Sequence, residues 1–176
     1  STPIKSSAAS DVYKRQAFPP AERIPFVILY RKAKGSNVTF FAVTQGDEFK
    51  GLVYTVWFND IVFIFYLAVS PDARGNGIGS KILSLVKDKF PNCRLVLNIE
   101  ALDENAENND ERIKRREFYV KNGFFGAGYN VREYSVIYEN MCYSKDLIPV
   151  SKDEYTALIK AYLGKIMYYF YSKLSE

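Results

Sequence analysis

Three short runs of apolar, aromatic and β-branched residues follow one another in the first half of the chain, at residues 37–43, 48–58 and 61–69. The turn-forming pairs Gly46-Asp47 and Asn59-Asp60 separate them. Strand-length runs joined by two-residue turns predict an antiparallel meander. The third run, IVFIFYLAV, is apolar nearly throughout, which predicts a central strand that is covered on both faces.

Helical and strand-like patterns then alternate. Residues 78–90 place apolar side chains at helical spacing with charged side chains opposite, which predicts an amphipathic helix that ends before a proline. The expected apolar stripe of this helix consists of Ile78, Ile82, Leu85 and Val86.

Further elements follow toward the C-terminus. We expect a strand at residues 94–102, a helix at about 107–121 closed by Asn122-Gly123, and strands near 125–131 and 135–143. Ser151 and Glu154 have the spacing of a capping box, so a last helix is expected to begin there. Residues 19–34 are also helical in pattern, with a break at a proline.

Composition narrows the class of protein. The chain has 176 residues, of which 48% are hydrophobic and 16% aromatic, as expected of one soluble globular domain. Its longest apolar runs are far shorter than the stretch of about 20 residues that a membrane span needs. The net charge of +4 gives no case for nucleic-acid binding, and the basic run at residues 112–116 is interpreted as a solvated helix face.

Two residue types restrict the chemistry. The chain has no histidine, which excludes Ser-His and Cys-His nucleophile pairs and histidine-ligated metal sites. Its two cysteines, Cys93 and Cys142, are far apart in sequence, so we expect no metal site and no disulfide framework. A reducing cytoplasm fits this usage best.

The first sixteen residues, STPIKSSAASDVYKRQ, lack apolar periodicity and a secretory signal pattern. The segment DVYKRQ can be encoded by a string that resembles the end of a sequencing adapter. We therefore expect residues 1–16 to be a non-native tail.

The stretch SPDARGNGIGSK, residues 70–81, carries the clearest chemical signal. A glycine-rich loop between a strand and a helix can point several backbone N–H groups at one anion, and Arg74 can add a charged contact. The glycine spacing fits neither a Walker loop nor a dinucleotide fingerprint. Taken alone, the loop is either an anion site or a tight turn.

Two longer segments resemble the GCN5-related N-acetyltransferase superfamily: LAVSPDARGNGIGSKIL at residues 67–83 and REFYVKNGF at 116–124. The resemblance implies an α/β (α+β) fold whose mixed, mostly antiparallel sheet has a central V-shaped split, is flanked by helices and carries a C-terminal helix. It implies an acetyltransferase domain at 17–145 that lacks the family's first strand and helix, and a helical extension at 146–176.

The same resemblance implies a site and a reaction. Acetyl-CoA would lie in the split between residues 61–69 and 94–102 and pass its acetyl group to a primary amine by direct attack, with no metal. Tyr119 would be the acid for the leaving thiolate and Glu100 the base. The implied cofactor contacts are Leu67, Val69, Arg74, Gly75, Asn76, Gly77, Ile78, Gly79, Ser80 and Asn108.

Several alternatives stay open. The sequence around Tyr119 fits a core aromatic residue as well as a catalytic acid. The sequence around Glu100 fits a salt-bridged glutamate as well as a catalytic base. The chain could instead be an acyl-CoA-binding module without catalysis, or an interaction protein that uses its aromatic terminal helix. The acceptor, a small-molecule or peptide amine, is not fixed by the sequence. The run at 167–171 fits a homodimer contact, a peripheral contact or an irregular chain end.

Overall fold

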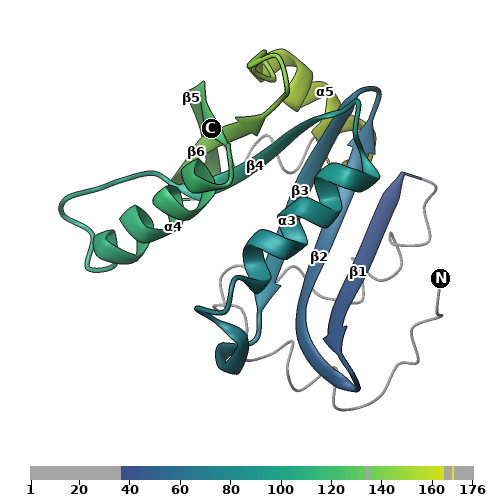
Figure 1. The fold of residues 1–176 in the computed structure, drawn as a ribbon. Coiled ribbons are helices and arrows are strands. Elements are labelled where there is room, and N and C mark those ends of the chain that lie inside the picture. Colours follow the sequence, from purple (N-terminus) through teal and green to yellow (C-terminus); the bar gives the residue numbers. More distant parts are fainter. Residues whose placement is uncertain (1–36, 134, 165–167, 169–176) are drawn as a thin grey trace.

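The computed structural model describes residues 37–133, 135–164 and 168 (Figure 1). The expectations for residues 1–16 and 19–34, and for the run 167–171 apart from Tyr168, lie outside the described residues. The strands are β1 (Val38–Gln45), β2 (Glu48–Phe58), β3 (Ile61–Val69), β4 (Arg94–Glu100), β5 (Phe125–Glu133) and β6 (Val136–Tyr143). The helices are the short 3-10 turn η2 (Pro71–Ala73), α3 (Ile78–Lys89), α4 (Asn109–Lys121) and α5 (Lys152–Leu163).

The strands form one sheet in the order β1-β2-β3-β4-β6-β5. Its neighbouring strands are antiparallel except for β3 and β4, which are parallel. The meander forms as predicted because its turns suit left-handed backbone: φ is 60° at Gly46 and 55° at Asn59. The expected mixed, mostly antiparallel α/β fold is therefore confirmed.

The parallel pair β3 and β4 separates after three residue pairs, the last of which is Phe63 with Val96. At the same level the register between β3 and β2 shifts, because Tyr54 pairs with Tyr66 whereas Thr55 pairs with Ile64. One extra residue on β3, Phe65, bends the strand there. In Figure 1, β4 runs on toward α4 while β3 leads to the loop before α3. The sheet is thus split along its centre.

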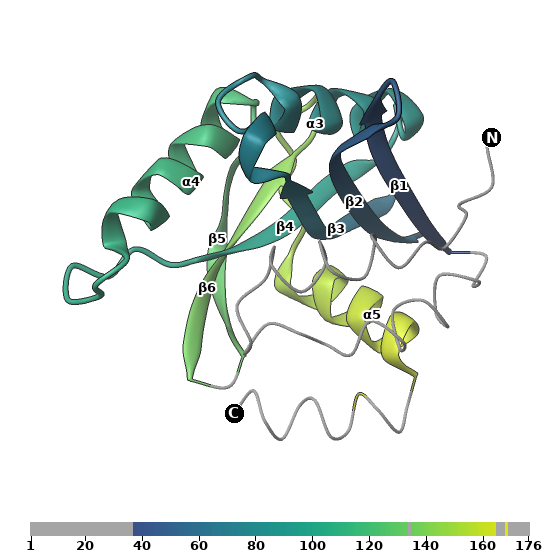
Figure 2. The same ribbon diagram turned by 90° about the horizontal axis from the view of Figure 1, so that it is seen from below.

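Helices cover both faces of the sheet: α3 and α4 lie on one face and α5 on the other (Figure 2). The core on the α3 and α4 side includes Val62, Ile64, Leu95 and Leu97, and the core on the α5 side includes Phe63 and Val96. Neighbouring residues of β3 and β4 therefore contribute to opposite cores. This explains why the run at 61–69 is apolar nearly throughout, as predicted for a central strand.

The apolar stripe of α3 shares Ile82 and Val86 with the predicted one, and Ile78 is half-buried. Its buried members are Gly79, Ile82, Leu83 and Val86, which follow the i, i+3, i+4, i+7 spacing of one helix face. Leu85 is 55% exposed, so its place in the predicted stripe was wrong. The helix is rotated so that Leu83 and not Leu85 points at the sheet.

Helix α5 is fixed to the sheet at both ends. The Ser151 hydroxyl accepts a hydrogen bond from the Glu154 amide and the Glu154 carboxylate accepts one from the Ser151 amide, so the predicted capping box is present. The same carboxylate binds the Arg94 guanidinium of β4 in a bidentate pair, with distances of 2.6 and 3.2 Å. At the far end, the hydroxyls of Tyr162 and Tyr54 are 3.0 Å apart.

Candidate functional site

The glycine loop, residues 74–80, follows β3 and lies beside the split. Its backbone leaves open space in front of the loop. Gly75 and Gly77 have φ angles of +79° and +73°, and a Cβ built on either would meet no atom within 4 Å. Side chains are disfavoured there by the backbone conformation, although there is room for them. A bound ligand would occupy the open space in front of these two glycines.

The amide groups of this loop are available to a ligand. Gly77 is the N-cap of α3 and provides no side-chain cap, and the first helical bond joins the Lys81 amide to the Gly77 carbonyl at 3.0 Å. The amides of Ile78, Gly79 and Ser80 therefore have no partner within the helix. Within the described ranges, no protein acceptor meets the amides of Gly75 or Asn76 either. These N–H groups and the helix dipole suit an anion.

Arg74 opens the loop and is exposed. Its Nε donates a hydrogen bond to the Val69 carbonyl at 3.4 Å, which places the guanidinium beside the end of β3. Asn76 is exposed, while Ile78 and Ser80 are half-buried. The structure therefore brings the predicted loop residues together around one space.

The backbone of β3 has a free edge along the split. The Ser70 amide donates to the Lys50 carbonyl of β2 at 3.0 Å, and the register of β2 and β3 is regular from Val69 back to Tyr66. Because successive residues of a strand point their amides to opposite edges, the amides and carbonyls of Leu67 and Val69 face away from β2. They therefore face the split, where the Val69 carbonyl accepts the bond from the Arg74 Nε.

Tyr119 is buried on the α3 and α4 side of the sheet, among the apolar residues of that core. Its ring packs against Phe118 and Phe124, with centroid distances of 5.1 and 5.7 Å. Burial raises the pKa of Tyr119 to about 12, so the phenol is protonated at neutral pH.

The end of α4 that carries Tyr119 has a well-defined turn. Gly123 has φ +81°, its amide donates to the Val120 carbonyl, and the Phe124 amide donates to the Tyr119 carbonyl. These two bonds form a Schellman motif, which confirms the predicted cap at Asn122-Gly123.

Glu100 ends β4 and is held by the start of α4. Its carboxylate contacts Arg115 at 2.9 Å and Arg112 at 3.4 Å, and it accepts a hydrogen bond from the Asn108 amide at 3.4 Å. Asn108 is the residue immediately before α4, and its side-chain oxygen also accepts a bond from Arg112 at 2.9 Å. Of the two patterns that the sequence allowed for Glu100, these contacts match the salt-bridged glutamate.

A group of polar residues that the sequence analysis missed lies on the α5 side of the split. Asn98 of β4 donates to the Tyr155 hydroxyl at 2.7 Å and accepts from the Asn140 amide at 2.8 Å. Asn140 is fully buried and Tyr155 is almost so. An isolated asparagine within the apolar run RLVLNIE was the one available sequence signal for this group.

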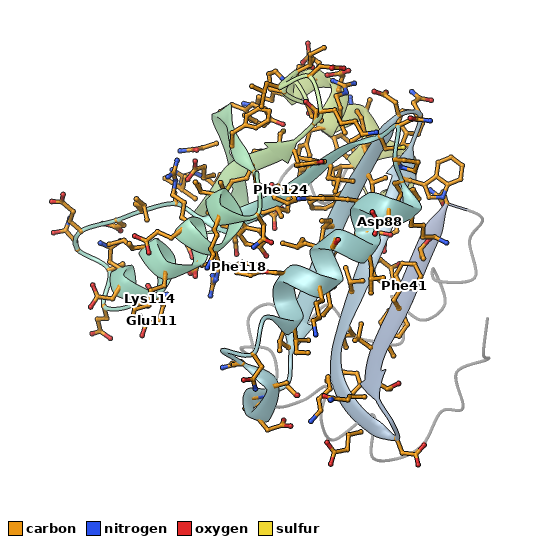
Figure 3. The ribbon with its side chains drawn as sticks, in the orientation of Figure 1. Phe41, Asp88, Glu111, Lys114, Phe118 and Phe124 are labelled. Atoms are coloured by element: carbon orange, nitrogen blue, oxygen red, sulfur yellow. The ribbon has the colours of Figure 1, made fainter. Side chains whose placement is uncertain are left out.

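A separate open hollow of about 600 Å³ lies beside α4, just after the end of β4 and along the first part of β5. One wall carries the bidentate pair between Arg116 of α4 and Glu139 of β6, with a shortest distance of 2.9 Å. Phe118, two residues later, contacts Gly79 of α3, so the hollow and the split lie on opposite flanks of α4. Figure 3 labels Phe118 on the side of α4 that is nearer to α3.

In the ranges that the structure describes, no cluster of three or more metal-ligating side chains occurs. Across the same residues, no helix has the length and apolar character needed to cross a bilayer.

Comparison with known proteins gives a family match. The model of the acetyltransferase (GNAT) domain matches residues 36–124, which include the glycine loop, the β3 and β4 pair and the whole of α4. YjbC of Bacillus subtilis (strain 168), which is named as an acetyltransferase, is 36% identical over 67 residues, 38% of this chain. The match spans 32% of that relative, so the chain covers less than a third of its length.

Solved structures resemble the chain in fold. A protein from Bacteroides thetaiotaomicron, described as an acetyltransferase of the GNAT family, is 18% identical, covers 93% of this chain and 97% of its own, and has a TM-score of 0.65. An aminoglycoside 6'-N-acetyltransferase complexed with coenzyme A is 14% identical over 64% of this chain and 75% of its own, with a TM-score of 0.50.

Proposed function

This chain belongs to the GNAT acetyltransferase family, and we propose on that basis that it transfers an acetyl group from acetyl-CoA to a primary amine by direct attack. The observation that carries the proposal is the glycine loop beside the split, with unpaired amides at the start of α3 and open space in front of Gly75 and Gly77. The aminoglycoside acetyltransferase of similar fold was solved with coenzyme A, which supports the choice of an acyl-CoA.

Binding is assigned to the backbone more than to side chains. The amides from Gly75 to Ser80 hold the pyrophosphate, and the exposed guanidinium of Arg74 adds a charged contact. The free edge of β3 at Leu67 and Val69 pairs with the amide groups of the pantetheine arm, in the way that a strand pairs with an added strand.

Acetyl-CoA supplies an activated acetyl group as a thioester. An amide at the free edge of β3 donates to the thioester carbonyl oxygen and stabilises the negative charge that grows there during attack. The Tyr119 hydroxyl, protonated at neutral pH, donates its proton to the sulfur as the carbon–sulfur bond breaks. The acceptor nitrogen forms the new bond to carbon and releases one proton to solvent, and solvent returns one proton to the Tyr119 phenolate.

The contacts of Glu100 and Asn108 suggest roles that differ from those the family resemblance implied. Because Glu100 binds Arg112, Arg115 and Asn108, we assign it to fixing the start of α4 and not to accepting the amine's proton. Asn108 belongs to the same group of contacts and supports the same helix. With α4 fixed at its start by Glu100, Tyr119 keeps its place near the end of that helix.

Isothermal titration of acetyl-CoA tests the proposal. We expect the unmodified protein to bind acetyl-CoA and the Gly77→Glu variant to lose binding, because a carboxylate would fill the space in front of the loop. Gly46→Glu is the matched control, since Gly46 has a similar φ of +60° and equally open surroundings in the β1–β2 turn. Equal binding by Gly77→Glu and the control would contradict the proposal. Binding without acetyl transfer to any amine would indicate a sensor module.

A further inference from the structure

The α5 side of the split carries a polar group that the reaction described above does not use. After the last pair between β3 and β4, Phe63 with Val96, Asn98 is the first residue of β4 whose side chain points to this side. It is half-buried, whereas its partner Asn140 has no exposed surface. Asn98 is thus the polar side chain of this group that a molecule entering the split can reach.

The orientation of the Asn98 amide is fixed by its partners. Its Nδ2 donates to the Tyr155 hydroxyl at 2.7 Å, and its Oδ1 accepts from Asn140 at 2.8 Å. An asparagine amide has two donor hydrogens, and its oxygen accepts two hydrogen bonds, so one of each stays free after these contacts. Tyr155 directly follows the capping-box residue Glu154 in α5, and its ring centroid is 5.4 Å from that of Phe63.

The opposite wall of this side of the split is aromatic. The extra residue in β3 puts both Phe65 and Tyr66 on the α5 side, where their ring centroids are 5.0 Å apart. Phe65 also packs against Tyr54 and Tyr162, at 6.1 and 5.7 Å. Among the described buried residues on this side, Asn140 is polar, the core side chains are apolar or aromatic, and none is charged.

Four carboxylates on or near β4 are already paired with arginines. Asp60 and Glu154 both bind Arg94, with shortest distances of 2.8 and 2.6 Å. Glu100 binds two arginines of α4, and Glu139 binds Arg116. A polyamine or other polycation needs carboxylates to replace the hydration of its second and third ammonium groups. These four carboxylates would have to give up an arginine to do so.

We infer that Asn98 orients the acceptor amine on the α5 side of the split, and that the acceptor is a monoamine with an apolar or aromatic body. The free lone pair of Oδ1 accepts a hydrogen bond from the acceptor nitrogen, and Phe65 and Tyr66 pack against its body. This inference rests on the proposed function, because it places the acceptor across the split from the glycine loop. It names the class of substrate, which the family membership does not.

Steady-state kinetics with two amines tests the inference. We expect kcat/KM for 2-phenylethylamine to exceed that for spermidine by about tenfold or more. The reason is that spermidine would have to displace an arginine from at least one carboxylate. Asn98→Ala should raise KM for 2-phenylethylamine by about tenfold, the effect of one lost hydrogen bond, and leave KM for acetyl-CoA unchanged. Asn98→Asp should shift the preference toward spermidine, because it adds an unpaired carboxylate. Asn92→Asp, at an exposed position before β4, is the matched control.

The outcomes separate this inference from the proposed function. If acetyl-CoA binds but spermidine is the better acceptor, or if Asn98→Ala leaves KM for the amine unchanged, the inference is wrong and the proposed function stands. If acetyl-CoA does not bind, both fail. A second readout does not need turnover: in the presence of CoA, 2-phenylethylamine should shift the side-chain amide NMR signals of Asn98 and not those of Asn92. Shifts of equal size in both would contradict the inference.

Discussion

The ring of Phe118 on α4 lies directly over Gly79 in the first turn of α3. A Cβ built at Gly79 would stand 2.9 Å from Cζ of that ring and 3.7 Å from a methyl group of Val69. The missing side chain at position 79 therefore allows α3, α4 and the end of β3 to meet at one point. Because this point adjoins the glycine loop, the contact fixes the distance between the two helices beside the split.

Gly79→Ala should destabilise the protein by about 1–3 kcal/mol through overpacking against Phe118, less whatever the helix gains from alanine. The double variant Gly79→Ala, Phe118→Leu should recover part of this loss, because the smaller side chain makes room for the new methyl group. Urea denaturation of the two single variants and the double variant measures the coupling. Ser84→Ala, at an exposed position of α3, is the control. Additive effects on the free energy of unfolding would show that residues 79 and 118 are not energetically coupled.

Tyr119→Phe should lower kcat by about 10²-fold or more while the affinity for acetyl-CoA stays unchanged, because the ring still packs and only the proton donor is lost. Since the pKa of Tyr119 is raised to about 12, the unmodified enzyme should show no loss of activity from this group up to about pH 10. A pH profile of kcat for both proteins tests this. Tyr143→Phe, which also keeps its ring, is the control. An unchanged kcat in Tyr119→Phe would remove the acid role.

Lys87→Met should reduce stability by about 1–2 kcal/mol, through the loss of a charged hydrogen bond and a cation–π contact. The Lys87 ammonium donates to the Asn122 carbonyl at 2.6 Å and lies 4.0 Å from the centre of the Tyr143 ring. It thereby links the last turn of α3 to the cap of α4. Thermal denaturation beside Lys114→Met, an exposed lysine of α4 labelled in Figure 3, tests the prediction. Equal melting temperatures for the two variants would mean that the link is weak.

Glu154→Gln should make the free energy of unfolding less dependent on pH in the acid range. The hydrogen bonds from Arg94 lower the pKa of Glu154 to about 2, below its value in the unfolded chain. Its contribution is therefore fully present above about pH 4.5 and is lost as the pH falls toward 2. The side chain is 40% exposed, so solvent screening keeps the effect small. The difference in urea midpoint between the unmodified protein and the variant should be smaller at pH 3 than at pH 6. Glutamine can keep the capping box, so the variant should lose only the charge of Glu154. Parallel profiles would disprove the linkage.

The sequence alone predicted the meander, the amphipathic helix after the glycine loop, the cap at Asn122-Gly123 and the capping box at Ser151. These features depend on residues close together in the chain: turn residues such as Gly46, periodic apolar positions, and capping groups three residues apart. The motifs around the glycine loop and around Tyr119 also pointed to the family, since their chemistry lies within single strand–loop–helix segments. The local sequence pattern was sufficient to predict these features because their interacting residues are close together in the chain.

The tertiary structure decided the features whose partners are far apart in sequence. The rotation of α3 that buries Leu83 and exposes Leu85 depends on where the sheet lies, and the periodicity of the helix alone does not give that. The pairing of Glu100 with Arg112 and Arg115 depends on how α4 lies against β4. The group of Asn98, Asn140 and Tyr155 joins two strands and the last helix, over separations of 42 and 57 residues. Such contacts form only when the sheet and its helices pack, because each partner needs the other to offset the cost of its burial.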